Sequence, residues 1–314
     1  MPYIIYLGPT DALSVARDIL DPPWTVLAPA PTPEAVTPHL NDAIAILDAS
    51  MKVRFDRAML DRGARLRVIS TATTGADHID DQVLAERRIP LLTLSGESEV
   101  LHNLTPAAEL SWLLLLACAR RLRGAIQHVL AGQWMREEFP GIMLKGKTLG
   151  LIGCGRIGSW MARYAHAFDM EVIGYDPFVT PWPEQICQYD LDSLLSTADF
   201  ISMHVPLNNQ TRGMLGPREF RLVKPGAVFL NTSRGGLIDE YALLQALADG
   251  RIKAAGIDVL EGEPAIDHHP LVGYAREHDN LIITPHIGGF SPDAVKVVVA
   301  HAAQRIVSIL GAGA

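Results

Sequence analysis

The sequence predicts an α/β protein with two doubly wound parallel sheets. Two observations indicate this class. Short apolar, β-branched runs alternate with helix-like stretches along the whole chain, and a glycine-rich turn near its middle joins one such run to a helix. The chain has 314 residues, which at roughly 150 residues per domain is enough for two domains with separate cores.

The first hundred residues predict one series of strands and helices. Strands are expected where apolar and β-branched residues cluster, at Tyr3–Leu7, Ala43–Asp48, Arg67–Thr71 and Pro90–Leu94. Helices are expected to begin near Asp11, Pro33, Asp56 and Asp80. Because strands and helices alternate, the strands are expected to lie parallel, with helices covering the faces of the sheet.

A longer apolar helix follows this series. Thr105 is placed to cap it, Pro106 suits its first position, and Glu109 falls in its positive first turn. The helix is expected to run through Leu110–Leu122, and it is apolar nearly all round. Two interpretations stay open, burial within a core and burial at an interface between domains or subunits.

A second series of six strands begins after this helix. The expected strands are Thr148–Gly153, Glu171–Tyr175, Phe200–Val205, Ala227–Asn231, Ala254–Asp258 and Leu281–Thr284, with helices beginning near Arg156, Leu191, Pro217, Asp239 and Pro292. Six parallel strands with intervening helices match a dinucleotide-binding sheet. The last helix is best explained as crossing back to the first domain. The predicted domains are therefore residues 1–100 with 290–314, and residues 101–289.

Composition and charge argue against several classes of partner. The formal net charge of −8 disfavours nucleic-acid binding. The N-terminus lacks the features of a secretory signal, and the apolar segment Leu110–Ala119 is too short to span a bilayer. The three cysteines are too widely spaced for a disulfide framework or a zinc site. We therefore expect a soluble, cytoplasmic protein without a metal, in which Asp267-His268-His269 is an exposed loop.

The strongest local signal is the run from Leu149 to Gly158, in which three glycines follow an apolar strand and open a helix. Gly153 permits the tight turn, Gly155 lets the backbone approach a pyrophosphate, and Gly158 allows close packing of helix on strand. The N–H groups at the start of the helix can then bind the anion. The sequence thus predicts a dinucleotide site here.

Asp176 ends the next expected strand, where a carboxylate can accept hydrogen bonds from both adenosine ribose hydroxyls and repel a 2′-phosphate. This position favours NAD over NADP. An aspartate that merely begins the turn before Pro177 would explain the residue type but not its place. Cys154, inside the glycine-rich turn, is expected to be a small filler.

Three polar residues, Arg234, Glu263 and His286, lie just after strands of the second series. Because ligands of open α/β sheets bind beyond the carboxyl ends of the strands, all three are expected to face one site. Their types fit hydride transfer to a 2-oxo acid. Arginine offers a planar fork for a carboxylate, histidine can donate a proton near neutral pH, and a glutamate beside the histidine orients its ring.

Several ordered motifs resemble those of the D-isomer-specific 2-hydroxyacid dehydrogenase family, which includes D-3-phosphoglycerate dehydrogenase and glyoxylate/hydroxypyruvate reductase. They cover essentially the whole chain and are Thr74–Asp80, Gly153–Gly158, His204–Leu207, Thr211–Gly213, Asn231–Gly235, Gly256–Val259, Glu263-Pro264 and Thr284–Gly289. The resemblance implies a Rossmann NAD-binding domain inserted into a flavodoxin-like substrate domain. It also implies NAD as cofactor and a small 2-oxo or 2-hydroxy acid as substrate.

The resemblance carries specific roles onto residues of this chain. Catalytic roles fall to Arg234, Glu263 and His286, and substrate contacts to Thr74 and Gly75 together with Arg234 and His286. Cofactor contacts fall to residues of the glycine-rich turn and of several strand ends, namely Gly153, Gly155, Arg156, Ile157, Gly158, Asp176, Val205, Pro206, Thr232, Ser233, Asp258 and Gly288. The family also implies a homodimer with its interface on the cofactor domain. The apolar helix expected through Leu110–Leu122 suits such an interface.

The sequence was compared in the same way with the motifs typical of other enzyme classes and folds. No tyrosine is followed by lysine four residues on, as in short-chain dehydrogenases, and no G-x-S-x-G hydrolase elbow occurs. Formate dehydrogenases of similar architecture carry glutamine at the position of Glu263. Because the sequence ends at Ala314, we expect no regulatory extension like that of longer phosphoglycerate dehydrogenases. An NAD-sensing binding or corepressor protein of this fold stays open, as does phosphoglycerate dehydrogenase activity specifically.

Overall fold

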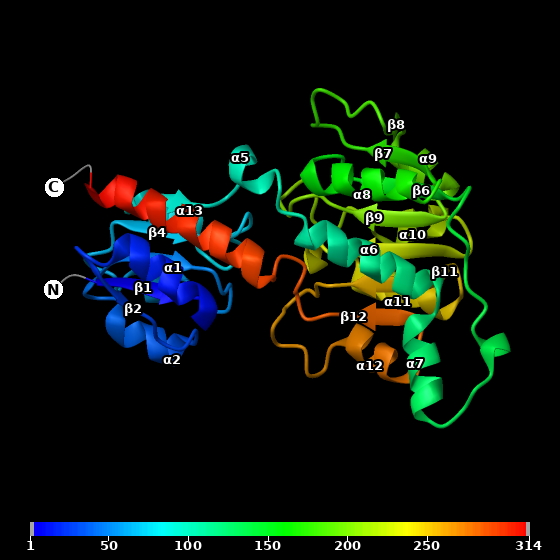
Figure 1. The fold of residues 1–314 in the computed structure, drawn as a ribbon, viewed down its shortest axis with the longest axis horizontal. Coiled ribbons are helices and arrows are strands. Elements are labelled where there is room, and N and C mark those ends of the chain that lie inside the picture. Colours follow the sequence, from blue (N-terminus) through cyan, green and yellow to red (C-terminus); the bar gives the residue numbers. More distant parts are fainter. Residues whose placement is uncertain (1–2, 312–314) are drawn as a thin grey trace. The chain divides into compact units, whose positions relative to one another are not determined.

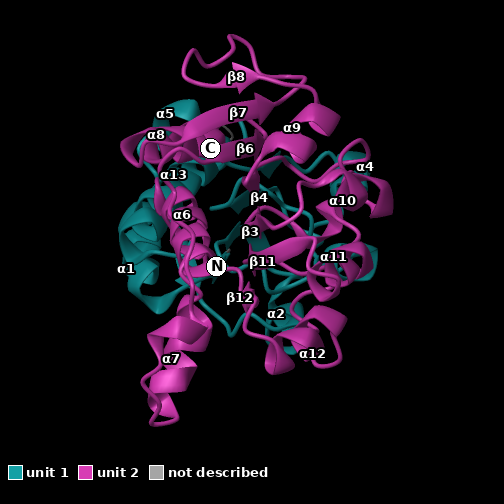
Figure 2. Cartoon of the chain, turned by 90° about the vertical axis from the view of Figure 1, so that its right-hand side faces the viewer, with its two compact units in different colours: residues 1–104, 290–314 teal, residues 105–289 magenta. Residues whose placement is uncertain are grey.

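The computed structural model describes residues 3–311, which divide into two compact units (Figure 2). Unit 1 contains residues 3–104 and 290–311, and unit 2 contains residues 105–289. The chain leaves unit 1, forms all of unit 2 and returns to unit 1 in its last helix (Figure 1). Each unit has its own parallel sheet and its own buried clusters.

The sheet of unit 1 has five strands in the order β2-β1-β3-β4-β5, and all its pairs are parallel. The strands are β1 (Tyr3–Leu7), β2 (Thr25–Leu27), β3 (Ala43–Asp48), β4 (Val68–Thr71) and β5 (Leu91–Leu92). The first and third match the expected ranges. Strand β2 was not predicted, since its three residues at the sheet edge are too few to show a pattern.

Alternate residues of these strands face two helical layers. Ile4 and Leu47 point into a cluster with α1 (Thr10–Leu20), α5 (Ser98–Leu101) and α13 (Pro292–Gly311). Ile5 and Ile46 point into the opposite cluster with α2 (Pro33–Val36), α3 (Arg57–Leu60) and α4 (Asp81–Glu86). This alternation of buried residues on both faces is what a parallel strand under two layers of helices requires.

Helix α13 completes unit 1 from the far end of the chain. Its length and composition would suffice to cross a membrane. In this structure Val299, Ala302 and Ile306 are fully buried against α1 and the sheet, and Ser70 of β4 donates a hydrogen bond to the carbonyl of Ala302 at 3.1 Å. The helix is therefore part of the core of unit 1.

The sheet of unit 2 has seven parallel strands in the order β12-β11-β10-β9-β6-β7-β8. The strands are β6 (Thr148–Ile152), β7 (Glu171–Tyr175), β8 (Cys187–Gln188), β9 (Phe200–Met203), β10 (Ala227–Asn231), β11 (Ile252–Ile257) and β12 (Leu281–Ile283). The six expected strands are present with ends shifted by at most two residues. The seventh, β8, is a two-residue edge strand that the sequence did not reveal.

Helices cover both faces of this sheet. On one face Leu149 and Leu151 of β6 are buried with α6 (Pro106–Ala119) and α8 (Arg156–Ala167). On the other face Ile152 is buried with the second set of helices. That set comprises α9 (Leu191–Thr197), α10 (Pro217–Leu222), α11 (Glu240–Ala248) and α12 (Pro270–Glu277). Helix α12 was not predicted.

The expectation of one helix through Leu110–Leu122 is wrong. Helix α6 ends at Ala119, because Arg121 adopts a left-handed conformation with φ of 49°, and α7 (Leu122–Leu130) begins after it. The predicted cap is also different, since the hydroxyl of Thr105 donates to the carboxylate of Glu109 rather than accepting a backbone N–H. Helix α6 packs on β10 and β11, so one of its faces belongs to the core of unit 2.

Candidate active site

The glycine-rich turn of unit 2 lies between β6 and α8. Gly153 has φ of 95°, and a Cβ atom there would lie 2.4 Å from the carbonyl oxygen of His204. A Cβ on Gly158 would lie 2.2 Å from the carbonyl oxygen of Gly153, whereas none of the protein's atoms would lie within 4 Å of a Cβ on Gly155. The first and last glycines are thus required by the fold, and the middle one leaves open space where a pyrophosphate can approach the backbone.

Arg156 is the first residue of α8, at the positive end of the helix dipole. Its side chain is partly buried, and this burial lowers the pKa of the guanidinium. An anion bound at this position would meet both the guanidinium and the positive end of the helix dipole. The residues of this turn therefore fit the pyrophosphate of a dinucleotide.

Asp176 follows β7 and supports the same turn. One carboxylate oxygen accepts the N–H of Cys154 at 3.0 Å, and the other accepts the N–H groups of Phe178 and Val179 at 2.9 and 3.1 Å. Each oxygen has two lone pairs, so the carboxylate can still accept from a ribose. Burial, aided by the charge of Asp176, raises the pKa of the Cys154 thiol to about 12, which agrees with a filler role.

A cavity of about 680 Å³ adjoins this carboxylate. It is lined by Tyr175, Asp176, Pro177, Gln188, Tyr189, Asp190 and Ser193. Another cavity, of about 530 Å³, lies where β11 and β12 begin and contains none of the predicted site residues. Because ligands of doubly wound sheets bind at the carboxyl ends of the strands, the first cavity is the one placed for a nucleoside.

The loops after β9 and β10 are held by short hydrogen bonds. The hydroxyl of Ser233 donates to the carbonyl of Met203 at 2.8 Å, and the hydroxyls of Thr232 and Ser111 lie 2.7 Å apart. The carbonyl of Pro206 accepts the hydroxyl of Thr211 at 2.6 Å. Val205, Pro206, Thr232 and Ser233 thus lie just beyond the carboxyl ends of two neighbouring strands, next to the glycine-rich turn.

Arg234 is positioned by Asn231, the last residue of β10. The amide of Asn231 donates to the carbonyl of Arg234 at 2.9 Å and accepts the N–H of Ser233 at 3.0 Å. The guanidinium donates to the carbonyl of Ser233 at 2.7 Å. A Cβ on Gly235 would lie 2.1 Å from the backbone nitrogen of Glu261, so only glycine lets this turn pack against the segment that carries Glu263.

Glu263 pairs with His286. Oε1 accepts a hydrogen bond from Nδ1 of His286, and Oε2 accepts the N–H of Leu260 at 3.1 Å. Burial alone would raise the pKa of Glu263, but the hydrogen bond and charge of His286, the Leu260 N–H and the charge of Arg234 outweigh it, so the pKa is lowered. About a third of each side chain is exposed, with values of 32% for Glu263 and 29% for His286.

The turn that carries His286 is organised by Asp258, which follows β11. His286 has φ of 54°, and its N–H donates to the carbonyl of Asp258 at 2.9 Å. The carboxylate of Asp258 accepts the hydroxyl of Thr284 and the N–H groups of Ile287 and Gly288, the last two at 2.9 and 2.7 Å. Burial raises the pKa of Asp258, while these donors act in the opposite direction. A buried carboxylate thus stabilises the left-handed histidine.

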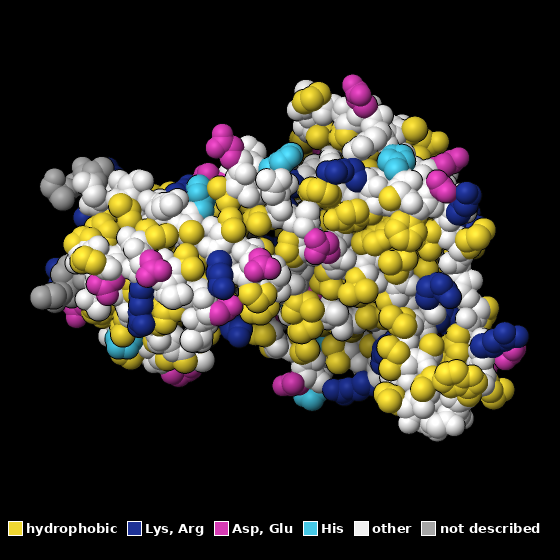
Figure 3. Space-filling view, in the orientation of Figure 1, with side chains coloured by type: hydrophobic (Ala, Val, Ile, Leu, Met, Phe, Trp, Pro, Cys, Tyr) yellow, Lys and Arg dark blue, Asp and Glu magenta, His cyan; other side chains and the backbone are white. Residues whose placement is uncertain are grey.

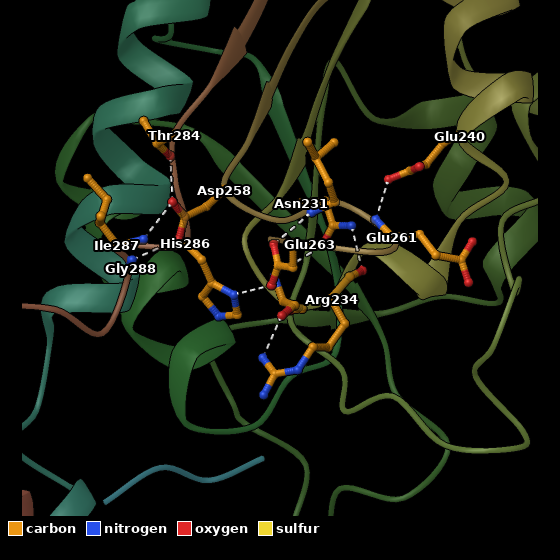
Figure 4. A network of polar contacts seen from close by, with 12 residues as sticks. Asn231, Arg234, Glu240, Asp258, Glu261, Glu263, Thr284, His286, Ile287 and Gly288 are labelled. Atoms are coloured by element: carbon orange, nitrogen blue, oxygen red, sulfur yellow. Dashed lines mark hydrogen bonds and ion pairs between the residues drawn. The ribbon is translucent and has the colours of Figure 1, made fainter. Parts of the chain in front are cut away.

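Figure 4 shows Arg234, Glu263 and His286 grouped beyond the ends of β10, β11 and β12. A carboxylate can only accept, so Nδ1 of His286 carries the proton that faces Glu263. The remaining ring nitrogen, Nε2, is then the atom that can exchange a proton with a ligand. A planar cation and a proton carrier beside one another suit a substrate that has both a carboxylate and a carbonyl.

Comparison with known proteins agrees with this geometry. The model of the D-isomer specific 2-hydroxyacid dehydrogenase NAD binding domain matches residues 112–288, more than half of the chain. The chain belongs to the D-isomer specific 2-hydroxyacid dehydrogenase family. The predicted family, the predicted fold of two parallel α/β sheets and the predicted NAD cofactor are thereby confirmed.

Two relatives show how much of each protein this chain matches. The chain is 36% identical over 308 residues to a D-3-phosphoglycerate dehydrogenase from Methanocaldococcus jannaschii, which covers 96% of this chain and 55% of that protein. It is 37% identical over 268 residues to a hydroxypyruvate reductase from Thermotoga maritima, which covers 85% of each. The chain therefore spans about half the length of the first relative and most of the second.

A structural neighbour is the D-lactate dehydrogenase from Aquifex aeolicus, solved with NAD and lactic acid. It matches with a TM-score of 0.85 at 25% identity, and the match covers 98% of this chain and 96% of that chain.

Thr74 and Gly75 belong to unit 1, in the loop after β4. The hydroxyl of Thr73 donates to the carbonyl of Gly75 at 2.7 Å, and the N–H of Leu94 donates to the carbonyl of Thr73 at 2.9 Å. The loop is thus fixed at the carboxyl edge of its own sheet. Its role toward substrate stays a prediction.

Sequence reasoning missed several residues that support the site. Asn231 and Thr284 lie at strand ends, and this position was the signal that could have marked them. His269 was predicted to be exposed, which is wrong: its side chain is 9% exposed and pairs with Glu240. Its neighbours Asp267 and His268 are exposed as expected. Within residues 3–311 no group of three or more metal-ligating side chains occurs.

Proposed function

We propose that this dehydrogenase interconverts a small 2-oxo acid and its D-2-hydroxy acid with NAD(H). The observation that carries the proposal is the hydrogen bond from His286 to an ionised Glu263, with Arg234 close enough to lower the pKa of that carboxyl. These residues follow strands β10, β11 and β12 at the carboxyl edge of the nucleotide-binding sheet, where ligands of such sheets bind.

Each of the three side chains has one task in this reaction. Arg234 binds the substrate carboxylate through its planar fork and polarises the neighbouring carbonyl. His286 donates the proton on Nε2 to the carbonyl oxygen as negative charge develops there. Glu263 accepts from Nδ1, fixes the orientation of the ring and stabilises the imidazolium. When bound, NADH supplies the hydride that the substrate carbon receives.

In the direction of oxidation the same residues act in reverse. Neutral His286 accepts the hydroxyl proton of the hydroxy acid, and ionised Glu263 stabilises the resulting charge. Because Glu263 is anionic at neutral pH, Nδ1 keeps its proton in both directions. Only Nε2 therefore exchanges a proton with substrate.

We assign the cofactor contacts to unit 2, and we divide the substrate contacts between Arg234 and His286 of unit 2 and a loop of unit 1. In unit 2 the glycine-rich turn with Arg156 and Ile157 binds the pyrophosphate, Asp176 binds the adenosine ribose, and the residues after β9, β10 and β11 line the nicotinamide side. In unit 1 Thr74 and Gly75 contribute to binding of the substrate carboxylate. Support for these roles comes from the open space at Gly155 and the cavity beside Asp176.

The substrate is best sought among glyoxylate, hydroxypyruvate, pyruvate, phenylpyruvate and 3-phosphohydroxypyruvate. Relatives named hydroxypyruvate reductase and glyoxylate reductase support the first two, and those named D-3-phosphoglycerate dehydrogenase support the last. The test measures kcat/KM for each acid with NADH and with NADPH. Turnover of at least one acid, with NADH preferred, is expected.

The same assay contains the outcomes that would contradict the proposal. Tight NADH binding, measured by fluorescence titration, without turnover of any of these acids would favour an NAD-sensing protein. Preference for NADPH would show that Asp176 does not select against the 2′-phosphate. In that case Asp176→Ala would leave the cofactor preference unchanged, whereas the proposal predicts that this variant narrows the preference for NADH.

We also propose that two copies associate through α7, in the cytoplasm. Leu122, Ile126, Val129 and Leu130 are 43% to 82% exposed and are spaced to form one face of the helix. Figure 3 shows hydrophobic side chains gathered over this part of unit 2. Unpaired thiols of all three cysteines suit a reducing compartment. Trp134, 87% exposed beyond the helix, would extend the interface.

A matched pair of variants tests this association. Val129 on α7 and Val297 on α13 are exposed to similar extents, at 50% and 47%. Val129→Glu is expected to convert a dimer to a monomer in light scattering after size exclusion, and Val297→Glu is expected to leave it dimeric. A monomeric wild-type protein, or equal effects of both variants, would refute α7 as the interface.

A further inference from the structure

A second imidazole–carboxylate pair lies in unit 2, outside the group formed by Arg234, Glu263 and His286. Nε2 of His269 lies 2.8 Å from Oε2 of Glu240, and their side chains are only 9% and 12% exposed. Glu240 is the first residue of α11, and His269 precedes the first residue of α12. The pair thus joins the starts of two helices on the same face of the sheet.

The other oxygen of Glu240 holds the segment that carries Glu263. Oε1 accepts the backbone N–H of Glu261 at 2.9 Å, as the dashed line in Figure 4 shows. Glu261 lies two residues before Glu263. Glu263 accepts the N–H of Leu260 as well as a hydrogen bond from His286, so the turn from 260 to 263 is closed by its own hydrogen bond. The position of Glu261 therefore sets the position of the Glu263 carboxylate.

Leu260, at the start of this turn, is buried in the core, and the exposed residues after it make few other contacts. Residues 261 to 265 are exposed, and Gly262 has φ of 83°. The ion pair of Glu261 with Arg212, at 3.3 Å, has both side chains about 60% exposed, and such pairs contribute little. Gly235 packs closely against the backbone of Leu260 and Glu261. The bond to buried Glu240 is the hydrogen bond that holds the backbone nitrogen of Glu261 at this point.

The pair is a poor device for stability by itself. Burial raises the pKa of Glu240, and the carboxylate of Glu261 adds to this effect, while the Glu261 N–H and His269 oppose it. Nδ1 of His269 is buried without a hydrogen-bond partner among the described residues. A buried ion pair with an unsatisfied nitrogen is often replaceable by apolar side chains without loss of stability. The geometry of the Glu240–His269 pair points to a role in positioning the turn that carries Glu263 rather than in stability.

We propose that Glu240 and His269 are positioning residues for the reaction, which hold Glu263 at hydrogen-bonding distance from His286. The inference rests on the proposed function, because it assigns the pair a task in that same site. His269 fixes the orientation of the Glu240 carboxylate, and Glu240 fixes the backbone of Glu261. Neither side chain contacts the substrate in this scheme.

The kinetic test compares Glu240→Ala, Glu240→Gln and a control, Asp267→Ala, in the full-length enzyme. Asp267 is an exposed carboxylate of the same segment. Displacing a catalytic group by about 1 Å can reduce turnover on the order of 100-fold. Glu240→Ala is expected to lower kcat about 10- to 100-fold with unchanged NADH affinity, and Glu240→Gln, which still accepts from Glu261, is expected to restore most of it. Asp267→Ala is expected to retain wild-type kcat.

A second measurement does not depend on turnover. In ¹⁵N-labelled protein the Nδ1 proton of His286 reports directly on its hydrogen bond to Glu263. This signal is expected to shift upfield or broaden in Glu240→Ala and to persist in Asp267→Ala. If the wild-type enzyme turned over none of the acids, the proposed function would fail while this signal still tested the positioning role.

Two outcomes would overturn the inference. One is a folded Glu240→Ala variant with wild-type kcat and an unchanged His286 signal. The other is a Glu240→Gln variant as impaired as Glu240→Ala, because the hydrogen bond to Glu261 would then not be the cause. If Glu240→Ala does not fold, His269→Gln replaces it in both measurements. This variant is expected to lower kcat about 10- to 100-fold. A wild-type kcat with an unchanged His286 signal would contradict the proposal.

Discussion

Each unit of this protein places a histidine–carboxylate pair at the carboxyl edge of its parallel sheet. In unit 1, Nε2 of His78 lies 2.7 Å from Oδ2 of Asp48, the last residue of β3. In unit 2, Nδ1 of His286 bonds Glu263. Both carboxylates come from segments that follow or end one strand, and both histidines come from the loop after the neighbouring strand. The two pairs differ in what surrounds them.

The pair of unit 1 is closed. Asp48 is fully buried and the His78 side chain is 11% exposed. Besides His78, Asp48 accepts the N–H and hydroxyl of Ser50 at 2.8 Å and the N–H of Met51 at 3.3 Å. The second ring nitrogen of His78 is buried without a partner among the described residues. Neither ring nitrogen of His78 is therefore placed to bind a ligand.

The pair of unit 2 is open, with about a third of each side chain exposed. Its histidine is also held in the left-handed region, a conformation that the turn around Asp258 must stabilise. The comparison teaches that two pairs of a histidine and a carboxylate, each at the carboxyl edge of a sheet, can differ in exposure. In the proposed function only the open pair exchanges a proton with a ligand. The variants below are chosen to break one pair at a time.

The largest effect is expected from His286→Ala in the open pair. A positioned general acid supplies about 10²- to 10⁴-fold in rate, so kcat/KM for the 2-oxo acid should fall by that factor. Because the side chain is partly exposed, the thermal midpoint should change little. Steady-state kinetics and thermal unfolding measure the two quantities. Activity within tenfold of wild type would show that another residue donates the proton.

Asp48→Ala in the closed pair should have the opposite signature. Removing one partner of a buried ion pair destabilises a protein by about 3–5 kcal/mol. Denaturant unfolding should show a loss of this order, whereas NADH affinity should stay at the wild-type value because unit 2 is unchanged. Arg57→Ala, which breaks an exposed pair with Glu86 in the same unit, is the control and should change stability little. Equal stability of Asp48→Ala and this control would contradict the distinction.

Arg234→Lys tests whether the reaction at the open pair needs the planar guanidinium of Arg234 beside it. Lysine keeps the charge but loses the two parallel donors, and a hydrogen bond to a charged group is worth about 1.5–3 kcal/mol. We expect kcat/KM for the acid to fall roughly 10- to 100-fold, with NADH affinity unchanged in fluorescence titration. A matching loss of NADH affinity would place Arg234 on the cofactor instead.

Much of this arrangement could be predicted from the sequence. Strands β3, β7 and β10 match their expected ranges, because each is a bounded apolar run. The grouping of Arg234, Glu263 and His286 could be predicted because polar residues that follow strands of one parallel sheet share an edge. These inferences depend on local pattern and on one topological rule.

What could not be predicted depends on contacts between distant segments. The pairs Glu240–His269 and Asp48–His78 join residues far apart in sequence, and no local pattern marks either histidine as buried. The break after α6 depends on Arg121, which adopts a left-handed conformation that is rare for arginine. The open or closed state of a pair is likewise a property of packing, which is why the sequence alone does not separate catalytic from structural histidines.

The smallest expected effect, and the one that separates the pairs most sharply, is a shift in pH dependence caused by Glu263→Gln. The pKa of Glu263 is lowered, because His286, Leu260 and Arg234 outweigh the effect of burial. A carboxylate with a lowered pKa in the folded state adds stability at pH values above its unfolded pKa, and this contribution is lost as pH falls through the folded pKa. The stability difference between wild type and Glu263→Gln should therefore be constant near neutral pH and shrink only below about pH 4.5.

The kinetic consequence of Glu263→Gln appears at the alkaline end. Reduction needs a protonated His286, and the ionised carboxylate favours that form, so its removal should move the alkaline limb of kcat/KM for reduction to lower pH. Oxidation, which needs neutral His286, should gain at lower pH in the same variant. Asp48→Asn removes the charge from the closed pair and should leave both limbs in place, since that pair exchanges no proton with substrate. A limb that moves in Asp48→Asn and stays in Glu263→Gln would reverse the assignment of the open and closed pairs, because the charge that supports the proton donor would then lie in unit 1.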